Sequence, residues 1–192
     1  MTWYSFLLFV HISMAIVWIG GGLMMQLFAL RAVKAGPARA AAFATDVEWI
    51  ANRTLIPSSL LAVVTGILLV VEGPWSFGDD WIVIGLVLFG ITFVAGITFL
   101  GPESGRLGKL IAEQGLESPE AGRRLGRIIL FSRLDLVLLF LIVFDMAVKP
   151  ELGDGGAILF ALLAAVAAAG LIVWRALAGA QAGQVSATAP AE

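Results

Sequence analysis

The sequence has no cysteine, a single histidine, a single tyrosine and few charged residues. Without cysteine, the chain can form no disulfide, hold no thiolate-ligated iron–sulfur cluster and perform no thiol chemistry. Charged residues make up 14% of the 192 residues, whereas soluble domains have about 25%. The formal net charge is −2, and Lys and Arg form no continuous basic stripe. Nucleic acid is therefore not expected as a partner.

Apolar residues are abundant instead, at 60% of the chain, and the mean hydropathy is +0.98. About 20 apolar residues cross the hydrocarbon core of a bilayer. Backbone groups in lipid must be hydrogen-bonded within their own segment, so each long apolar run is predicted to be a helix. The predicted spans are residues 4–30, 55–71, 81–100, 128–148 and 157–177. We predict an all-α, polytopic membrane protein with five transmembrane helices.

Charge predicts the orientation of these spans. The connections between spans one and two and between spans three and four are basic, with Arg31, Lys34, Arg39, Arg53, Arg106, Lys109, Arg123, Arg124 and Arg127. In the other two connections, residues 72–80 and 149–156, the only basic residue is Lys149. Because basic connections stay inside, we expect the N-terminus outside and the C-terminus inside.

The lengths of the connections predict how the spans pack. Short outer connections, marked by Gly73-Pro74 and by residues 149–156, favour antiparallel neighbours and a four-helix up-down bundle. The inner connections have helical composition and should continue or skirt the spans as helices. Span five is alanine-rich, and its only ionisable residue, Arg175, lies near its inner end, which indicates a peripheral helix. We expect residues 1–177 to form one transmembrane domain and residues 178–192 to be a disordered tail.

The single histidine, His11, lies inside span one and is the first candidate functional residue. An ionisable side chain in hydrocarbon usually faces a bundle interior, a cavity or a ligand. Asp145, near the outer end of span four, could meet it if the two spans are neighbours. Such a pair could be structural, a proton relay or an oriented metal ligand. Alternatively, His11 is hydrogen-bonded within the bundle.

Charged residues also occur at the inner side of span four. Arg133 and Asp135 are two residues apart, so they face different directions on a helix and need other partners. Arg53 could reach Asp135, and Asp46 or Glu48 could reach Arg133. We predict structural ion pairs that involve Arg53, Arg133, Asp135 and Asp145, with a proton or anion site as the alternative.

Methionines raise the alternative of a metal site. Met14 is one turn from His11 on the same helix face, and thioethers with imidazole suit Cu(I). Methionine is also an ordinary packing residue, so a copper site at His11 and Met14 is the less favoured interpretation.

Several short motifs resemble a group of small bacterial membrane proteins. The motifs are residues 10–22 (VHISMAIVWIGGG), 65–69 (TGILL), the tryptophans Trp75 and Trp81, and the stretch from Arg133 to Pro150. They cover about 150 residues and resemble the HemJ-type protoporphyrinogen oxidases, the CopD-type copper-resistance proteins and a family catalogued as domain of unknown function 2269. The last is the most similar. The resemblance places the chain in a bacterial cytoplasmic (inner) membrane.

The resemblance to HemJ-type enzymes implies a haem ligand at His11. A lysine expected in the third helix of those enzymes is Gly85 here, and Arg133-Leu134-Asp135 departs from their arginine motif. One histidine cannot bind haem b from both sides, so the iron would be five-coordinate, or the opposite ligand would be Met146 or would come from a second protomer.

No paired catalytic constellation is present in the sequence, so an enzyme is not the favoured interpretation. We expect a non-enzymatic membrane protein that serves as an accessory subunit of a larger complex, with a protein partner or a second copy of the chain. One alternative is a b-type haem redox protein with His11 as axial ligand. The other is copper or proton handling through His11, Met14 and Asp145.

Overall fold

The computed structural model describes residues 2–115 and 118–188, without the side chains of residues 37, 38, 41, 44, 45 and 177–188. Within these ranges the chain is helical and contains no strand, which confirms the predicted all-α class. The helices are α1 (Trp3–Lys34), α2 (Pro37–Ile50), the π-helical turn η1 (Ala51–Leu55), α3 (Ile56–Glu72), α4 (Asp80–Ala95), the π-helical turn η2 (Gly96–Leu100), α5 (Gly101–Gln114), α6 (Pro119–Val148) and α7 (Gly155–Thr188).

Two of the long helices are continuous through a π-helical turn. α2, η1 and α3 follow one another without a break, as do α4, η2 and α5. The sequence prediction that the connecting segments continue the spans as helices is therefore confirmed. Only the turn at Ala35 and Gly36 separates α1 from α2, and residues 115–118 separate α5 from α6.

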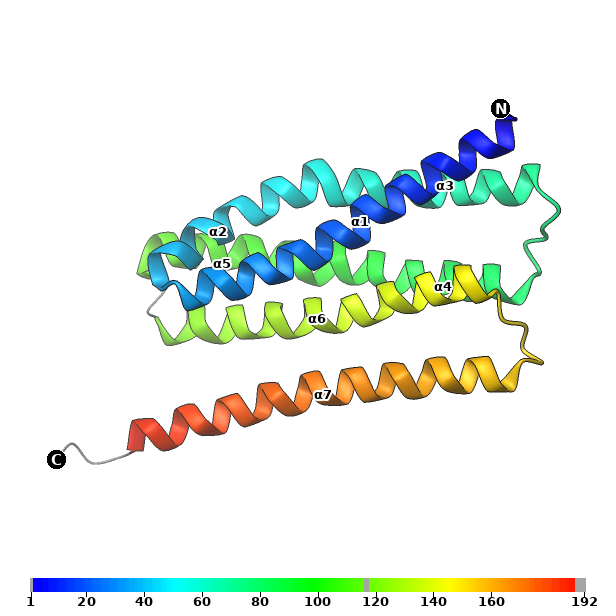
Figure 1. The fold of residues 1–192 in the computed structure, drawn as a ribbon. Helices are drawn as coiled ribbons and strands as arrows, with labels where there is room; N and C mark the ends of the chain where they lie inside the picture. The colour runs from blue at the N-terminus through cyan, green and yellow to red at the C-terminus, as the bar shows by residue number, and fades with distance from the viewer. Residues whose placement is uncertain (1, 116–117, 189–192) are drawn as a thin grey trace.

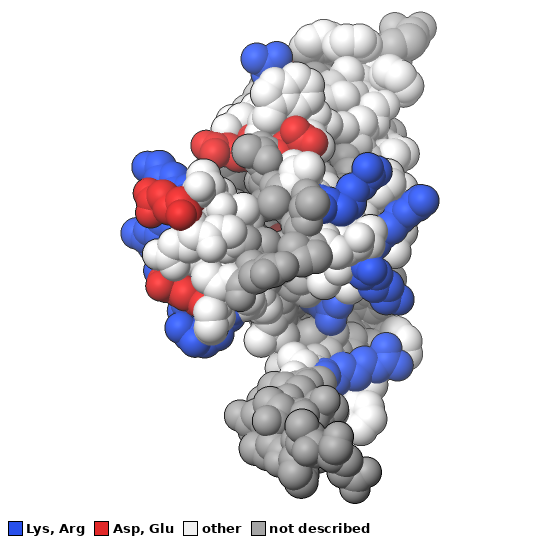
Figure 2. Space-filling model, turned by 90° about the vertical axis from the view of Figure 1, so that its left-hand side faces the viewer, with Lys and Arg blue, Asp and Glu red and all other residues white. Residues whose placement is uncertain are grey.

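The long helices lie lengthwise beside one another (Figure 1). α1 packs against α3 and α6, and α4 packs against α6. The connections alternate between the two ends of the molecule, so successive long helices are antiparallel. We call the end with the α1–α2 and α5–α6 connections the basic end, because Arg31, Lys34, Arg39, Lys109 and Arg123 lie in or beside these connections. Figure 2, which faces this end, shows Lys and Arg side chains around it.

Four helices of the described chain are long and apolar enough to cross a membrane. They are Trp3–Lys34, Asp46–Glu72, Asp80–Gln114 and Gly155–Ala176. α6 has 30 residues and lies between α4 and α7, but its apolar part carries Arg133, Asp135 and Asp145. The structure therefore confirms several membrane-length helices, and α6 differs from them by its three ionisable side chains.

α7 packs against α6, which agrees with the peripheral position predicted for span five. Its backbone stays helical to Thr188, although we expected a disordered tail from residue 178. Residues 178–188 include four alanines, and alanine has the highest helix propensity. Residues 189–192 of the predicted tail lie outside the described residues.

Proline explains both π-helical turns. Pro57 and Pro102 lack a backbone N–H, and each ring would clash with the carbonyl four residues earlier in a regular α-helix. The residue before each proline donates its backbone N–H to the carbonyl five residues earlier. Ile56 donates to the carbonyl of Ala51, and Gly101 donates to the carbonyl of Gly96. The helix thus widens for one turn instead of breaking.

Candidate functional site

A cavity of about 320 Å³ lies inside the bundle, between α1, the α2–η1–α3 helix, the α4–η2–α5 helix and α6. Most of its wall is apolar, and its large side chains include Trp18, Met25, Phe43, Phe93 and Leu139. Ligand pockets commonly have volumes of about 300–1,000 Å³ and mostly apolar walls with a few polar groups. The cavity meets this description. Its few polar groups determine which kind of molecule it can bind.

Two oxygens in the cavity wall are buried without a hydrogen-bond partner among the residues that the structure describes. They are Oε1 of Gln26, on α1, and Oδ1 of Asp135, on α6. Gln26 is only 9% exposed. A buried oxygen without a partner costs about 1–3 kcal/mol, and such atoms are rare in native proteins. Both atoms can accept a hydrogen bond from a molecule in the cavity.

Three of the hydroxyl groups in the wall are already engaged as donors. Ser59 donates to the carbonyl of Ile56 at 2.9 Å, Thr92 to that of Phe89 at 3.0 Å and Ser132 to that of Ile128 at 2.5 Å. Each hydroxyl oxygen keeps a lone pair that can accept. Because none of these hydroxyls donates to a base, none is prepared as a nucleophile.

Both π-helical turns line this cavity. Ala51, Asn52 and Leu55 come from η1, and Gly96, Ile97 and Leu100 come from η2. A wide turn shifts the side chains beyond it around the helix axis, and such turns are frequent at functional sites. The two prolines therefore shape opposite walls of the same cavity.

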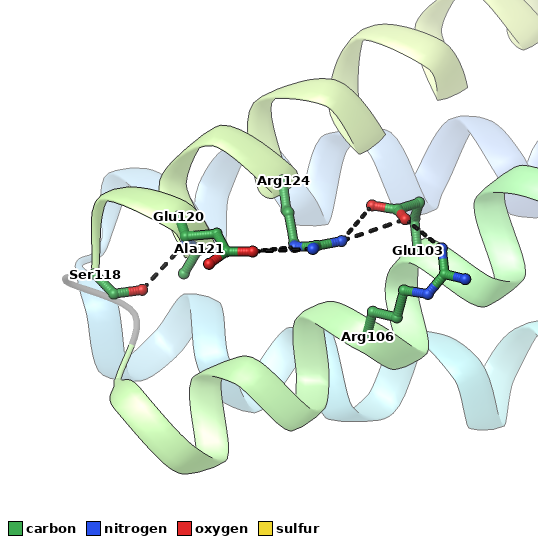
Figure 3. Close-up of polar contacts among 6 residues, drawn as sticks. All are labelled: Glu103, Arg106, Ser118, Glu120, Ala121 and Arg124. Carbon is green, nitrogen blue, oxygen red and sulfur yellow. Dashed lines mark hydrogen bonds and ion pairs between the residues drawn. The ribbon is translucent and has the colours of Figure 1, made fainter.

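A cluster of charges ties α5 to α6 near the basic end of the cavity (Figure 3). Arg124 of α6 lies between Glu120, at 2.9 Å, and Glu103 of α5, at 3.0 Å. Arg106 adds a second ion pair to Glu103 at 2.8 Å. The hydrogen bond from Arg124 to Glu120 raises the pKa of the Arg124 guanidinium. Neighbouring residues of both helices, Ser104, Leu107 and Leu125, line the cavity, so the cluster fixes this part of the wall.

His11 lies against α3. Its Nδ1 is 2.8 Å from the carbonyl oxygen of Ala62 and 3.4 Å from the hydroxyl of Thr65. Because a carbonyl can only accept, Nδ1 carries the proton and donates it, and Nε2 is left as an acceptor. A Cβ on Gly66 would lie 3.1 Å from the imidazole ring, so glycine allows this close approach. The alternatives for His11 were a pair with Asp145 and a hydrogen bond within the bundle. The structure shows the hydrogen bond within the bundle.

Asp145 lies against α4 instead of meeting His11. It is 2% exposed, and neither carboxylate oxygen has a hydrogen-bond partner. A Cβ on Gly85 would lie 3.0 Å from Oδ2 of Asp145 and still closer to Met146. Gly85 is the position at which the resemblance to HemJ-type enzymes expects a lysine. The absence of that side chain lets α4 and α6 approach and leaves Asp145 without a cation there.

The predicted ion pairs of Arg53, Arg133, Asp135 and Asp145 do not form within the described part of the chain. Arg53 instead lies over the ring of Trp49 at 4.8 Å. The ion pairs that do form belong to the Glu103 cluster, which sequence reasoning missed. Its signal was the i, i+4 spacing of Glu120 and Arg124 and the i, i+3 spacing of Glu103 and Arg106.

The residues that would hold haem or copper are not brought together. The hydrogen bonds of His11 run to α3, whereas Met146 and Asp145 lie against Gly85 of α4. The wall of the cavity includes neither His11 nor Met146, and Met14 is absent from it as well. The described residues also contain no group of three His, Asp or Glu side chains that could hold a metal. The arrangement does not fit a haem between His11 and Met146, so we derive no chemistry from it.

Comparison with known proteins gives one result. No curated protein and no solved structure matches the chain. The model of a family described as predicted integral membrane protein, DUF2269, matches residues 5–150. This range covers α1 to α6, with the cavity, the π-helical turns and the charged cluster, and leaves out α7. The chain therefore belongs to the DUF2269 family of predicted integral membrane proteins.

Proposed function

We propose that the protein is a non-enzymatic membrane protein that binds an apolar molecule with a hydroxyl group in the cavity of its helical bundle. The observation that carries the proposal is the pair of partnerless buried oxygens, on Gln26 and Asp135, in an otherwise mostly apolar wall. A bound hydroxyl would donate to one or both of them and remove the cost of leaving them unpaired.

The chemistry of the wall defines the class of ligand. The wall offers apolar and aromatic surface together with acceptor oxygens, so it suits a phenol, a quinol or an alcohol that dissolves in lipid. A strongly charged solute would lose its hydration in such a cavity without adequate compensation. The wall hydroxyls of Ser59, Thr92 and Ser132 donate to backbone carbonyls, which favours binding over a chemical step.

The position in the membrane is part of the proposal. We infer five transmembrane helices, including α6, in the bacterial cytoplasmic membrane, with the N-terminus outside and the C-terminus inside. The charges at the basic end support this orientation (Figure 2). Asp135 follows the start of the apolar part of α6, Ile128, by seven residues, or about 10 Å of helix. The ligand would then lie within the inner leaflet.

For the role of the protein in the membrane, we keep the accessory subunit predicted from the sequence. We propose that the protein serves a larger membrane complex as an accessory subunit that holds this lipid-soluble molecule. Haem and copper roles are not part of the proposal, which rests on the cavity, and neither His11 nor Met146 is among its described lining residues.

A pair of matched probes tests the proposed function. 1-Naphthol and naphthalene share the same rings, and only 1-naphthol can donate a hydrogen bond. With the purified protein in one detergent, we expect 1-naphthol to raise the Tm more than naphthalene does. In Gln26→Leu and in Asp135→Leu, binding of 1-naphthol should weaken about fivefold, the equivalent of one hydrogen bond, while naphthalene binding should persist.

Detergent micelles take up each probe equally for every variant, so differences between variants report the protein. Phe28→Leu, at an exposed apolar position of α1, is the control and should behave as the wild type. Equal stabilisation by the two probes in the wild type would contradict the proposal.

A further inference from the structure

A second apolar site lies outside the bundle, along the groove between α1, α6 and α7. Its volume is about 560 Å³. Its wall is formed by leucines of α1, by aromatic and aliphatic residues of α6 and by alanines of α7; they include Leu23, Leu27, Val137, Phe140, Ala164 and Ala168. Phe144 and Phe160 meet at its far end, with ring centroids 6.1 Å apart. The groove is separate from the proposed ligand cavity, although Gln26 and Leu136 lie in both walls.

Among the described residues, the only charged one in the wall of this groove is Arg133. Within the same part of the chain, Arg133 has no ion pair and no side-chain hydrogen bond. An arginine at this depth in an apolar helix requires an anion, water or a lipid headgroup to compensate its charge. The described wall supplies no anion here, which makes the groove complementary to an anionic ligand.

Further positive charge lies at the same end of the groove. Arg133 is the wall residue of α6 nearest the basic end, and Leu27 and Ile172 line the groove on α1 and α7. Helical spacing of four and three residues places Arg31 and Arg175 on the same faces as Leu27 and Ile172. Three arginines from three helices thus surround one end of an apolar groove.

The length of the groove matches one leaflet. From Arg133 to Phe144 the wall spans 11 residues of α6, or about 16 Å at 1.5 Å per residue. Half of the hydrocarbon core of a bilayer is about 15 Å thick. A molecule with an anionic head at Arg133 and an apolar chain along the groove therefore has the dimensions of a phospholipid in the leaflet at the basic end.

We propose that the groove between α1, α6 and α7 holds one anionic phospholipid, whose phosphate accepts hydrogen bonds from Arg133 and whose acyl chain packs between α1 and α7. Two parallel N–H donors of a guanidinium match two phosphate oxygens. Arg31 and Arg175 add charge that favours an anionic head over a zwitterionic one.

Native mass spectrometry of the detergent-purified protein tests this site. The protein is given equal amounts of phosphatidylglycerol and phosphatidylcholine with the same acyl chains. We expect the wild type to retain one phosphatidylglycerol in preference to phosphatidylcholine. Arg133→Gln should reduce that preference about tenfold, and Arg133→Lys should keep part of it. Arg123→Gln removes an exposed charge of the same helix, outside the groove, and should retain the preference.

A second pair of variants tests the groove without removing a charge. Ala164→Trp would fill the groove and should displace the lipid, whereas Leu163→Trp, at an exposed position one residue earlier, should not. This pair decides the question if Arg133→Gln does not fold. Stabilisation by 1-naphthol should be unchanged in Arg133→Gln, so the two sites can fail separately.

Two results would overturn the proposal. One is that Arg133→Gln, folded, retains the same preference for phosphatidylglycerol as the wild type. The other is that the wild type has the mass of two copies and that Ala164→Trp converts it to one copy without loss of lipid. That second result would assign the groove to another copy of the chain.

Discussion

At the residue scale, His11 illustrates how a distinctive residue can have a local role. Its Nδ1–H donates a hydrogen bond to the carbonyl of Ala62. This bond joins α1 to α3 through a side chain. The sequence placed His11 and Asp145 in the outer parts of their spans, and from that placement a pair between them was reasonable. Rotation about the helix axes decides the outcome, because it turns His11 towards α3 and Asp145 towards α4.

Gly66→Ala should therefore destabilise the protein. The new Cβ would lie 3.1 Å from Cε1 and 3.3 Å from Nδ1 of His11, so the ring must move and its bond to Ala62 weakens. We expect a loss of about 1–3 kcal/mol in the free energy of unfolding, the usual range for overpacking.

Gly20→Ala is the matched control for that substitution, because its Cβ would meet no atom within 4 Å. Alanine there should instead stabilise the helix by about 0.5–1 kcal/mol. Denaturant unfolding in detergent measures both variants, and equal effects at the two glycines would rule out the account of His11.

At the element scale, the two proline-induced π-helical turns separate what the sequence could predict from what it could not. Apolar run length located the helices, and the composition of the inner connections predicted that they continue as helices. A π-helical turn, however, inserts about one residue into the helical register and rotates the rest of the helix by about 100°. Binary patterning therefore could not tell which faces of α3 and α5 point inward.

Pro57→Ala tests the role of these turns. Alanine restores the N–H that can bond the carbonyl of Arg53, so η1 should relax towards a regular α-helix and rotate Asn52 relative to the cavity. We expect weaker stabilisation by 1-naphthol without loss of folded stability, since proline is the least favourable residue inside a helix. Pro119→Ala is the control, because Pro119 lies in the first turn of α6, where no helical bond is missing. An unchanged response in Pro57→Ala would show that η1 does not shape the site.

At the scale of the whole molecule, the helices are held together at both ends, with the cavity nearer the basic end. At the opposite end, Lys149 ends α6 in a left-handed conformation and its Nζ lies 3.8 Å from the ring of Trp75 and 5.0 Å from that of Trp81. At the basic end the Glu103 cluster joins α5 to α6 (Figure 3). The sequence predicted the bundle but not the contacts between helices, because Glu103 and Arg124, like Lys149 and Trp75, are far apart in the chain.

Glu103→Gln should lower the Tm. Glu103 is 8% exposed and pairs with both Arg106 and Arg124, so its neutral replacement leaves Arg106 without a carboxylate and Arg124 with Glu120 alone. Salt should reduce part of this difference, because the Arg106 side chain is 66% exposed and an exposed pair is screened. Glu113→Gln, on an exposed part of α5 without an ion pair in the described chain, is the reference. Identical melting of the two variants would mean that the cluster does not secure the basic end.

The most direct test of the account is to fill the cavity without touching its polar groups. Gly96 lies in the cavity wall, and a Cβ there would meet no atom within 4 Å. Gly90 lies on the same long helix but outside the wall, and a Cβ there would likewise meet no atom within 4 Å. The measurement is the shift in Tm on addition of 1-naphthol to Gly96→Leu and to Gly90→Leu. If 1-naphthol binds in the cavity, the shift is lost in Gly96→Leu and retained in Gly90→Leu. A full shift in Gly96→Leu would contradict the claim that the cavity is the binding site.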